Sequence, residues 1–438
     1  MGGGLLQLVA YGAQDVYLTG NPQITFFKVV YRRHTNFALE AIQQTFNGNP
    51  AYGQRVTCQI SRNGDLIHRV YLAVDLGAGN TDKLCKFYGL RLINYVEVEI
   101  GGQRIDRHYS HWMYVWNELS LPISKKAGYY DMIGAYGGPV SGGTAGYQMN
   151  QVLYIPLEFW FCRNVGLALP LIALQYHEVK INLNFETAAN CGGTATIPSM
   201  GFNASIWVDY VFLDTDERRR FAQLSHEYLI EQLQFTGQEA ITNVNMKPKL
   251  NFNHPCKELV WFTTAVAADN NNWMNYTTNS VDGGAYPDAS KALVYGTPAT
   301  SAATKSASDN TVAKIIEKLS AQTNSALNHT VQAKLVLNGN DRFALRNGSY
   351  FNLIQPFQHH ENIPANAGIN VYSFSLKPED HQPSGSLNMS RIDTSVLNLT
   401  MSSALTYPGT SGYNLYVYAV NYNVLRILSG MGGLAYSN

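Results

Sequence analysis

The sequence predicts an all-β protein of two tandem eight-stranded antiparallel jelly rolls, a double jelly roll with a short linking helix and long surface loops. Tyrosine (28), phenylalanine (18) and glycine (37) are abundant, as is usual in strand-rich proteins with many turns. Landmarks of the first half recur, in the same order, in the second half. Each copy holds about eight short segments between Gly, Pro and Asn turns, the number that two four-stranded sheets require.

The internal repeat is carried by five pairs of segments. In each pair a strand pattern, and often the turn after it, is written twice. By residue number the pairs are 39–46 with 230–237, 56–76 with 249–264 (strands at 249–252 and 259–264), 96–104 with 333–342, 152–185 with 371–401, and 205–212 with 415–422. The period of roughly 190 residues far exceeds that of a solenoid, so each copy is expected to be a whole domain. Two unrelated β-sandwiches remain the alternative.

The repeat divides the chain into residues 1–36, a first jelly roll at 37–213, a linking helix at 214–227 and a second jelly roll at 228–438. Asp214 and Glu217 have the spacing of a capping box, which predicts the start of the linking helix. The carboxylates of Asp214, Asp216 and Glu217 are expected to cap this helix and to pair with the three arginines that follow them.

Two segments interrupt the repeat and are expected to form long surface loops. The first, residues 111–149, begins with an aromatic stretch at 112–116 and continues as a Gly-rich run at 134–146. The second, residues 265–328, is rich in Ala, Ser, Thr and Asn and contains one predicted helix at 312–321. Long loops on a rigid sandwich commonly carry recognition.

The charge balance argues against a nucleic-acid partner. Lys plus Arg equals Asp plus Glu at 31 each, and charged residues make up 14% of the chain. Binding to a polyanion requires clustered cations. No apolar run reaches the roughly 20 residues of a membrane span, and no signal peptide is visible, which favours a cytosol-like compartment. Cysteines lack a C-x-x-C pair and are expected to be buried reduced thiols: Cys58, Cys85, Cys162, Cys191 and Cys256.

Neither a catalytic nor a metal or cofactor site is predicted. Three groups of possible metal ligands lack a convergent set of further ligands: His108 with His111, His177 with Glu178, and His359 with His360. The Gly-rich runs lack the Lys-Ser/Thr of a phosphate-binding loop. A structural protein that assembles through its surfaces is therefore expected. Two other classes remain open, a lectin-like β-sandwich and a jelly-roll enzyme of the cupin or glycosidase kind.

Three blocks resemble signatures of the major capsid proteins of nucleocytoplasmic large DNA viruses. They are YGAQDVYLTGNPQITFFK at residues 11–28 with its continuation to 37, GLALPLIALQYHEV at 166–179, and NYNVLR at 421–426. The likeness is greatest to the capsid proteins of chlorella-infecting algal viruses. It runs from about Leu6 to the C-terminus and is weakest across residues 265–328.

The resemblance implies a structural protein of the virion shell, made and assembled in the host cytoplasm. Three chains would form a homotrimeric, pseudo-hexameric capsomer, and capsomers would tile the icosahedral shell of a large double-stranded DNA virus. It also implies contacts with neighbouring capsomers and with minor capsid proteins on the inner face. The repeat then has a reason, because three chains of two similar jelly rolls can occupy a nearly sixfold place in a lattice.

The resemblance further assigns the N-terminal segment to the inner face as an assembly segment. Its basic cluster, Lys28, Arg32 and Arg33, lies in a sequence whose pattern predicts a strand. Ion pairing of these residues is favoured over contact with DNA. The residues singled out are Tyr11, Gln14, Asp15, Phe26, Phe27, Lys28, Arg32 and Arg33.

Relatives carry glycans on outward loops of the second jelly roll, added by virus-encoded enzymes that do not follow the usual triplet. The Asn- and Thr-rich segment at 265–328 is accordingly expected to form part of the outer face and to serve as a glycan platform. Candidate glycosylation sites are Asn275, Asn328, Asn388 and Asn398.

Overall fold

The structure is a computed structural model, and it falls into two units, Met1–Phe37 and Ala38–Asn438, which are described separately. The residues that it describes are 3–10, 12–78, 80–135, 137–139, 151–193, 197–266, 270, 273–277, 328–403, 405 and 412–436. The predicted helix at 312–321, most of the 265–328 segment and most of the Gly-rich run at 134–146 lie outside these residues.

The N-terminal unit contains two short helices, α1 (Gly3–Val9) and α2 (Val16–Thr19). Asp15 stabilises the turn before α2, because its side chain accepts a hydrogen bond from the Gly12 N–H at 2.7 Å. From residue 20 to residue 36 the backbone forms no strand. The prediction that the basic cluster lies in a strand is therefore wrong, since an alternating pattern becomes a strand only where a partner strand is present.

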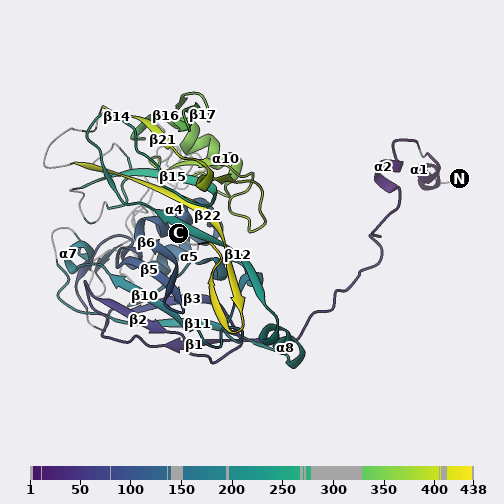
Figure 1. Ribbon diagram of the computed structural model, residues 1–438, viewed down its shortest axis with the longest axis horizontal. Coiled ribbons are helices and arrows are strands. Elements are labelled where there is room, and N and C mark those ends of the chain that lie inside the picture. The colour runs from purple at the N-terminus through teal and green to yellow at the C-terminus, as the bar shows by residue number, and fades with distance from the viewer. Residues whose placement is uncertain are drawn as a thin grey trace, which may run out of the picture. The chain divides into compact units, whose positions relative to one another are not determined.

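Two sheets form the first jelly roll (Figure 1). Both are antiparallel and both contribute side chains to one core. The first sheet has the order β1 (Phe37–Gln44), β11 (Asn203–Leu213), β3 (Leu66–Asp75), β8 (Val152–Pro156), with β9 (Leu169–Pro170) on β3. The second has the order β2 (Arg55–Gln59), β10 (Val179–Phe185), β5 (Ile93–Ile100), β6 (Gln103–Tyr109).

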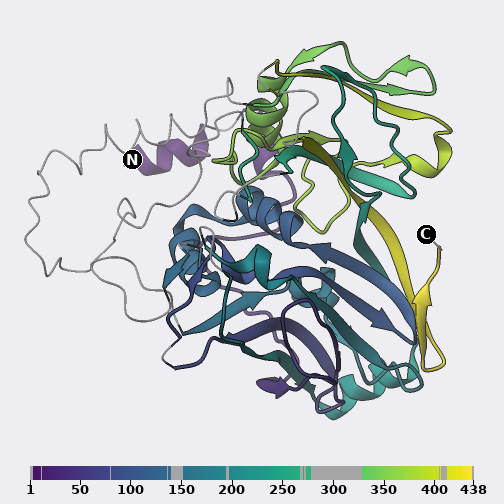
Figure 2. The same ribbon diagram turned by 90° about the vertical axis from the view of Figure 1, so that its left-hand side faces the viewer.

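The second jelly roll repeats this order. One sheet reads β12 (His226–Phe235), β22 (Tyr413–Leu428), β15 (Pro255–Ala265), β19 (Asn370–Ser373), with β13 (Glu239–Ala240), β20 (Leu387–Asn388) and β23 (Met431–Leu434) added. The other reads β14 (Asn245–Met246), β21 (Ser395–Met401), β16 (Thr330–Leu337), β17 (Asn340–Asp341), with β18 (Arg346–Asn347) on β16. In both halves the first strand pairs with a long strand near the end of the roll, β11 or β22, and the predicted double jelly roll is confirmed. Figure 2 shows the two rolls stacked, with β12 and β22 running from one to the other.

Matching turns show that the halves share local geometry as well as strand order. Gly101 and Gly102 connect β5 to β6, and both have positive φ. Asn338 and Gly339 connect β16 to β17 in the same way, also with positive φ. Two consecutive left-handed residues make the hairpin turn that matches the twist of antiparallel strands, and glycine and asparagine adopt it at least cost.

Two predicted elements differ from the structure. The strand expected at 249–252 is replaced by the two-residue strand β14 further upstream, and Lys249 makes only an isolated bridge to Val396. The segment at 111–149 is not a surface loop at its start, because residues there form α4 (Ser110–Ser120) and α5 (Ile123–Ile133). The aromatic side chains of α4 are buried, which favours a helix packed against a core over an exposed loop.

A short helix, α8 (Thr215–Gln223), joins the rolls, and β12 begins three residues after it. Asp214 caps α8 by accepting from the Thr215 N–H rather than from Glu217, so the capping box does not form. The predicted pairing among neighbours is also wrong for Arg218, which forms its ion pair with Asp65 of the first roll at 2.9 Å. Asp65 also accepts the Leu213 N–H, so this carboxylate fixes the exit of the chain from the first roll.

The shorter elements fill the connections. Two small strands, β4 (Lys83–Leu84) and β7 (Gly138–Pro139), pair with each other. The remaining helical turns are α3 (Tyr88–Arg91), α6 (Trp160–Arg163), η1 (Val165–Leu167), α7 (Ala188–Cys191), η5 (Tyr350–Ile354), α10 (Gln355–His359) and η6 (Met389–Arg391). Within the described residues no helix is long and apolar enough to cross a membrane.

Candidate functional site: the contact between the two jelly rolls

In the sheet β12-β22-β15-β19 of the second roll, strand β15 is buried on both faces. Along β15, Leu259 and Trp261 point into the core of the second roll, whereas Val260 and Phe262 belong to the core of the first roll. Successive side chains of a strand point to opposite faces, so one strand serves two cores. We call the packing of this outward face on the first roll the roll contact.

Helix α4 supplies the first roll's side of the roll contact. Trp112 lies 5.5 Å from the ring of Tyr418, and both residues are almost fully buried. Beside them Phe262 stacks on Tyr276 with ring centroids 4.1 Å apart. Burying an aromatic or large aliphatic side chain contributes roughly 1.5–3 kcal/mol each, so this face holds the rolls together strongly.

His111 lies inside the aromatic cluster and is a structural residue there. Its Nδ1 is 2.9 Å from the Tyr276 hydroxyl, and its ring contacts Phe262 and Trp273. Burial lowers the pKa of His111 to about 3, with a smaller contribution from Arg91. The imidazole is therefore neutral at physiological pH and hydrogen-bonds as a neutral group.

Polar groups fix the register of the roll contact along β12, which lies beside β6. The Gln232 side chain donates to the Ile105 carbonyl, and Asp106 accepts the Leu233 N–H at 3.0 Å. Asp106 also lies 2.9 Å from His108. Such directional bonds are satisfied at one register only, whereas apolar faces tolerate small shifts.

A network of buried charged side chains also crosses the roll contact. Glu231 of β12 accepts from Arg163 of the first roll at 2.9 Å and from Lys257 of β15 at 2.6 Å. Lys257 is fully buried and its ammonium lies over the ring of Tyr422 at 5.1 Å. A buried ammonium is tolerated only when it is paired, so Glu231 satisfies two cations of different rolls at once.

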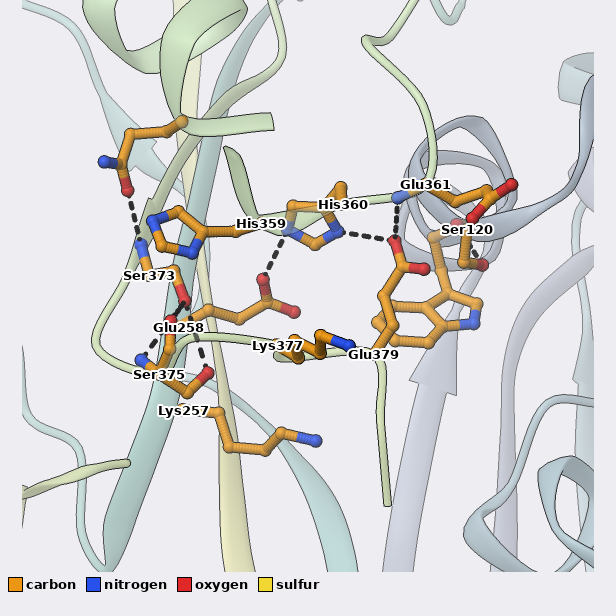
Figure 3. A network of polar contacts seen from close by, with 12 residues as sticks. Ser120, Lys257, Glu258, His359, His360, Glu361, Ser373, Ser375, Lys377 and Glu379 are labelled. Atoms are coloured by element: carbon orange, nitrogen blue, oxygen red, sulfur yellow. Dashed lines mark hydrogen bonds and ion pairs between the residues drawn. The ribbon is translucent and has the colours of Figure 1, made fainter. Parts of the chain in front are cut away.

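A second buried network anchors α10 to the second roll (Figure 3). The side chain of His360 is fully buried; its Nε2 lies 2.8 Å from Glu258 of β15 and its Nδ1 lies 2.7 Å from Glu379. Burial by itself lowers the pKa of His360, but the two carboxylates outweigh it and raise the pKa to about 9. The protonated imidazole thus ties together a helix, a strand and a loop.

Each histidine considered as a metal ligand has a structural partner instead. His177 Nδ1 lies 2.8 Å from the Gly432 carbonyl oxygen, and His359 Nδ1 lies 2.9 Å from that of Leu376. Across the described residues, no group of three or more His, Cys, Asp or Glu could hold a metal ion. His359 and His360, although adjacent, point to different partners (Figure 3).

Sequence reasoning missed the residues of the buried charge networks. Cys256-Lys257-Glu258-Leu259-Val260 places two charges at the start of an otherwise apolar strand, and buried Lys and Glu are rare unless they are paired. That signal indicates buried partners. It does not name them, because Arg163 and Glu231 come from distant parts of the chain.

The four candidate asparagines differ in exposure. Asn388 is exposed, whereas Asn275 and Asn398 are half-buried. Asn328 is 4% exposed, and its carboxamide donates to Asn370 and accepts from the Thr330 N–H. A side chain held in this way is poorly placed to receive a glycan.

Replacing Glu231 by alanine is expected to destabilise the chain by about 3–5 kcal/mol, because Lys257 would be left as a buried unpaired cation. Glu227→Ala is the matched control. Glu227 lies on the same strand and pairs with Arg426, but both side chains are more than half exposed, and the expected cost is below about 1 kcal/mol. Equilibrium unfolding in urea measures both, and equal losses would contradict this account.

The stabilisation contributed by His360 is expected to depend on pH. Its pKa is raised from 6.5 to about 9, so the stabilisation is complete below about pH 6.5 and is lost as the pH rises through about 9. The effect is on the order of 3 kcal/mol. Unfolding of the native chain and of His360→Gln, followed between about pH 6 and 10, should show a stability difference that shrinks with rising pH. Parallel profiles would refute the assignment.

Comparison with known proteins places this architecture in one family. Residues 25–214 match the model described as the major capsid protein N-terminus, and residues 217–433 match the model described as the large eukaryotic DNA virus major capsid protein. The major capsid proteins of Pyramimonas orientalis virus, Phaeocystis pouchetii virus and Paramecium bursaria Chlorella virus 1 are 50%, 47% and 45% identical, each over the full length of both chains.

Solved structures agree. A crystal structure of PBCV-1 VP54 superposes with a TM-score of 0.75 at 41% identity, covering 94% of this chain and 100% of that one. The quasi-atomic model of the PBCV-1 virus capsid gives a TM-score of 0.74 at 40% identity, over 94% of this chain and 100% of that one. The Faustovirus major capsid protein, at 14% identity and a TM-score of 0.69 over 95% and 94% of the two chains, shares the fold. The chain therefore belongs to the major capsid proteins of the large eukaryotic DNA viruses, structural proteins of the virion shell and not enzymes.

Proposed function

We propose that three copies of this chain form a capsomer of nearly sixfold outline, and that such capsomers tile the icosahedral shell of a large double-stranded DNA virus. The observation that carries the proposal is the roll contact. Two domains with the same strand order are held in one fixed relation by a shared core and buried charges. Three rigid pairs supply six similar sandwiches to a threefold ring.

Assembly into a regular lattice requires that the two jelly rolls of one chain keep a rigid relation to each other. A flexible tether would let the two rolls take many relative orientations, and a lattice of identical contacts would then pay a large ordering entropy. Here α8 and the roll contact leave little such freedom. The domain division at residues 37–213, 214–227 and 228–438 is part of this proposal.

The N-terminal segment is proposed to bind minor capsid proteins and neighbouring capsomers on the inner face. Phe26 and Phe27 have exposed fractions of 88% and 97%, and Val30 and Tyr31 are also exposed. Exposed apolar side chains in sequence lacking its own core favour an interaction segment. Lys28, Arg32 and Arg33 lie among them and are suited to ion pairs with such partners.

Glycans on the outer loops are a further part of the proposal, with the segment at 265–328 as the platform. Of the candidate sites, Asn388 is exposed and at the start of η6, and so is the best placed to carry one. Synthesis and assembly in the host cytoplasm are supported by the thiols. None of the five cysteines forms a disulfide, and burial raises the pKa of Cys58 to about 11, which keeps it protonated.

Light scattering of the purified chain should give three times its mass of 48.6 kDa, and negative-stain images should show a threefold particle with a hexagonal outline. A chain lacking residues 1–24 is expected to form the same trimer but to be absent from assembled shells, since its rolls are intact and its inner-face segment is shortened. Monomers of the shortened chain would contradict this division of roles.

Intact-mass spectrometry of the protein taken from virions should exceed the 48.6 kDa of the bare chain by whole sugar residues. The same chain made in bacteria should show the bare mass. A virion protein at the bare mass would refute the glycan platform.

A further inference from the structure

A shared irregularity aligns the strand pair β3–β11 of the first roll with the pair β15–β22 of the second. In the first roll Val70 pairs with Val208 and Ile67 with Tyr210, so β3 carries one extra residue there. In the second roll Glu258 pairs with Val420 and Cys256 with Asn421, so β15 also carries one extra residue. A β-bulge is a fixed structural feature, and aligning the two bulges sets the equivalence of the sheets.

This equivalence identifies a counterpart of the roll contact. The outward pair Val260 and Tyr418 of the second roll corresponds to Tyr71 and Trp207 of the first, which are also paired across β3 and β11. Val260 and Tyr418 are buried by the first roll. The outward face of the sheet β1-β11-β3-β8 is therefore the same surface. Among the described residues a helix covers only one end of it, where Phe221 of α8 packs on Leu66 and Val211.

The rest of this face carries apolar or aromatic side chains on all four strands. Tyr71 and Trp207 are half-buried, and Val152 and Tyr154 on β8 have exposed fractions of 37% and 47%. On β1, Leu39 is 62% exposed and alternates with the inward-facing Ile42. Apolar and aromatic side chains on one sheet face, in a thinly charged chain, indicate a contact surface.

Helix α4, which covers the sheet of the second roll in the roll contact, has a counterpart in the second roll. In the first roll α4 lies between β6 and β8, and in the second roll η5 and α10 lie between β18 and β19. Helix α4 is buried in the roll contact, whereas the outer side of η5 and α10 is bare: Phe357 is 76% exposed and Ile354 is 44% exposed. Phe351 of η5 is fully buried, so the helical segment has one face in the core and one apolar face outside.

The helical segment is rigid enough to act as a docking element. His360 anchors its end to Glu258 and Glu379 (Figure 3), and the Gln355 side chain accepts the Ser373 N–H of β19 at 3.0 Å. A pre-organised surface loses little entropy when it binds, which is the reason that buried support improves a contact.

We propose that the η5–α10 face of one copy docks on the outward face of the sheet β1-β11-β3-β8 of the next copy, repeating between chains the roll contact within each chain. This inference rests on the proposed trimer and names its interface. The contact is head-to-tail, so each copy offers one helical face and one sheet face, and a closed ring leaves neither uncovered.

Phe357→Asp and Tyr154→Asp each place a charge in the proposed interface, one on each side. Each is expected to weaken trimer formation at least ~10-fold in concentration, because aromatic anchors dominate such contacts. Tyr176→Asp is the matched control: Tyr176 is 74% exposed but lies against Gly430 of the β22–β23 hairpin. Light scattering across a dilution series measures the effect, and circular dichroism with thermal unfolding confirms that each variant is folded.

A photoreactive benzoylphenylalanine at position 357 tests the partner surface without loss of the aromatic ring. Inter-chain cross-links are expected to peptides that contain residues 37–44, 66–75, 152–156 or 203–213. Cross-links elsewhere, or trimers of Phe357→Asp and Tyr154→Asp as stable as the native ones, would overturn the interface and leave the trimer standing. A native chain that stays monomeric at every concentration would overturn the trimer as well.

Discussion

The fixed relation between the two jelly rolls depends on one sheet that contains a strand, β15, with no solvent-facing side. An antiparallel sheet usually packs one face on a core and leaves the other to water, which produces alternating burial. Strand β15 departs from this rule, since every residue from Cys256 to Thr264 is buried. Because its two faces belong to two cores, the second roll cannot fold fully without the first beside it. The chain behaves as one body although it is built from two similar domains.

In the roll contact the apolar faces stabilise the packing of the two rolls, and the buried charges restrict it to one arrangement. A sheet packed on a helix by aromatic rings can shift slightly at little cost, but Lys257, Glu231 and Arg163 allow one arrangement. A buried ion pair often adds little net stability, since desolvation offsets the attraction. Its effect is that any wrong arrangement leaves a charge unpaired in the interior. The same reasoning applies to His360 between Glu258 and Glu379, which fixes α10 in place.

Local patterns in the sequence predicted much of the fold. The Asn338-Gly339 turn and the alternation in β21 result from local conformational preferences, and such patterns can be read directly from the sequence. The repeat was found because the same patterns occur twice in the same order along the chain. Helix α4 could also have been found, because Trp112, Trp116 and Leu119 fall on one helical face. The aromatic content and the Gly-rich run after it led to the wrong prediction of a loop.

Other features were beyond reach of local patterns. Strand β14 has two residues, too few to show any alternation. The partners of the roll contact come from distant segments, so Arg163 and Glu231 carry no mutual signal in the sequence. The N-terminal segment has a strand-like pattern, but no strand in its own unit pairs with it. Strand pairing depends on tertiary contacts. In these cases the local sequence shows a tendency to form a strand but does not show whether a partner strand is present.

In a chain of two similar rolls that meet head-to-tail, one contact surface of each roll is left uncovered. The contact within the chain uses the helical face of the first roll and the sheet face of the second, so the opposite surfaces stay bare at the two ends. Burying them inside one chain would require a third roll, which would leave the same two surfaces bare again. Only a ring or an unlimited filament removes the ends, and closure depends on the angle set by the roll contact. With 31 positive and 31 negative residues, the chain also meets its own copies without net repulsion. The interaction that holds the two rolls at a fixed angle thus also decides how many chains can close around an axis.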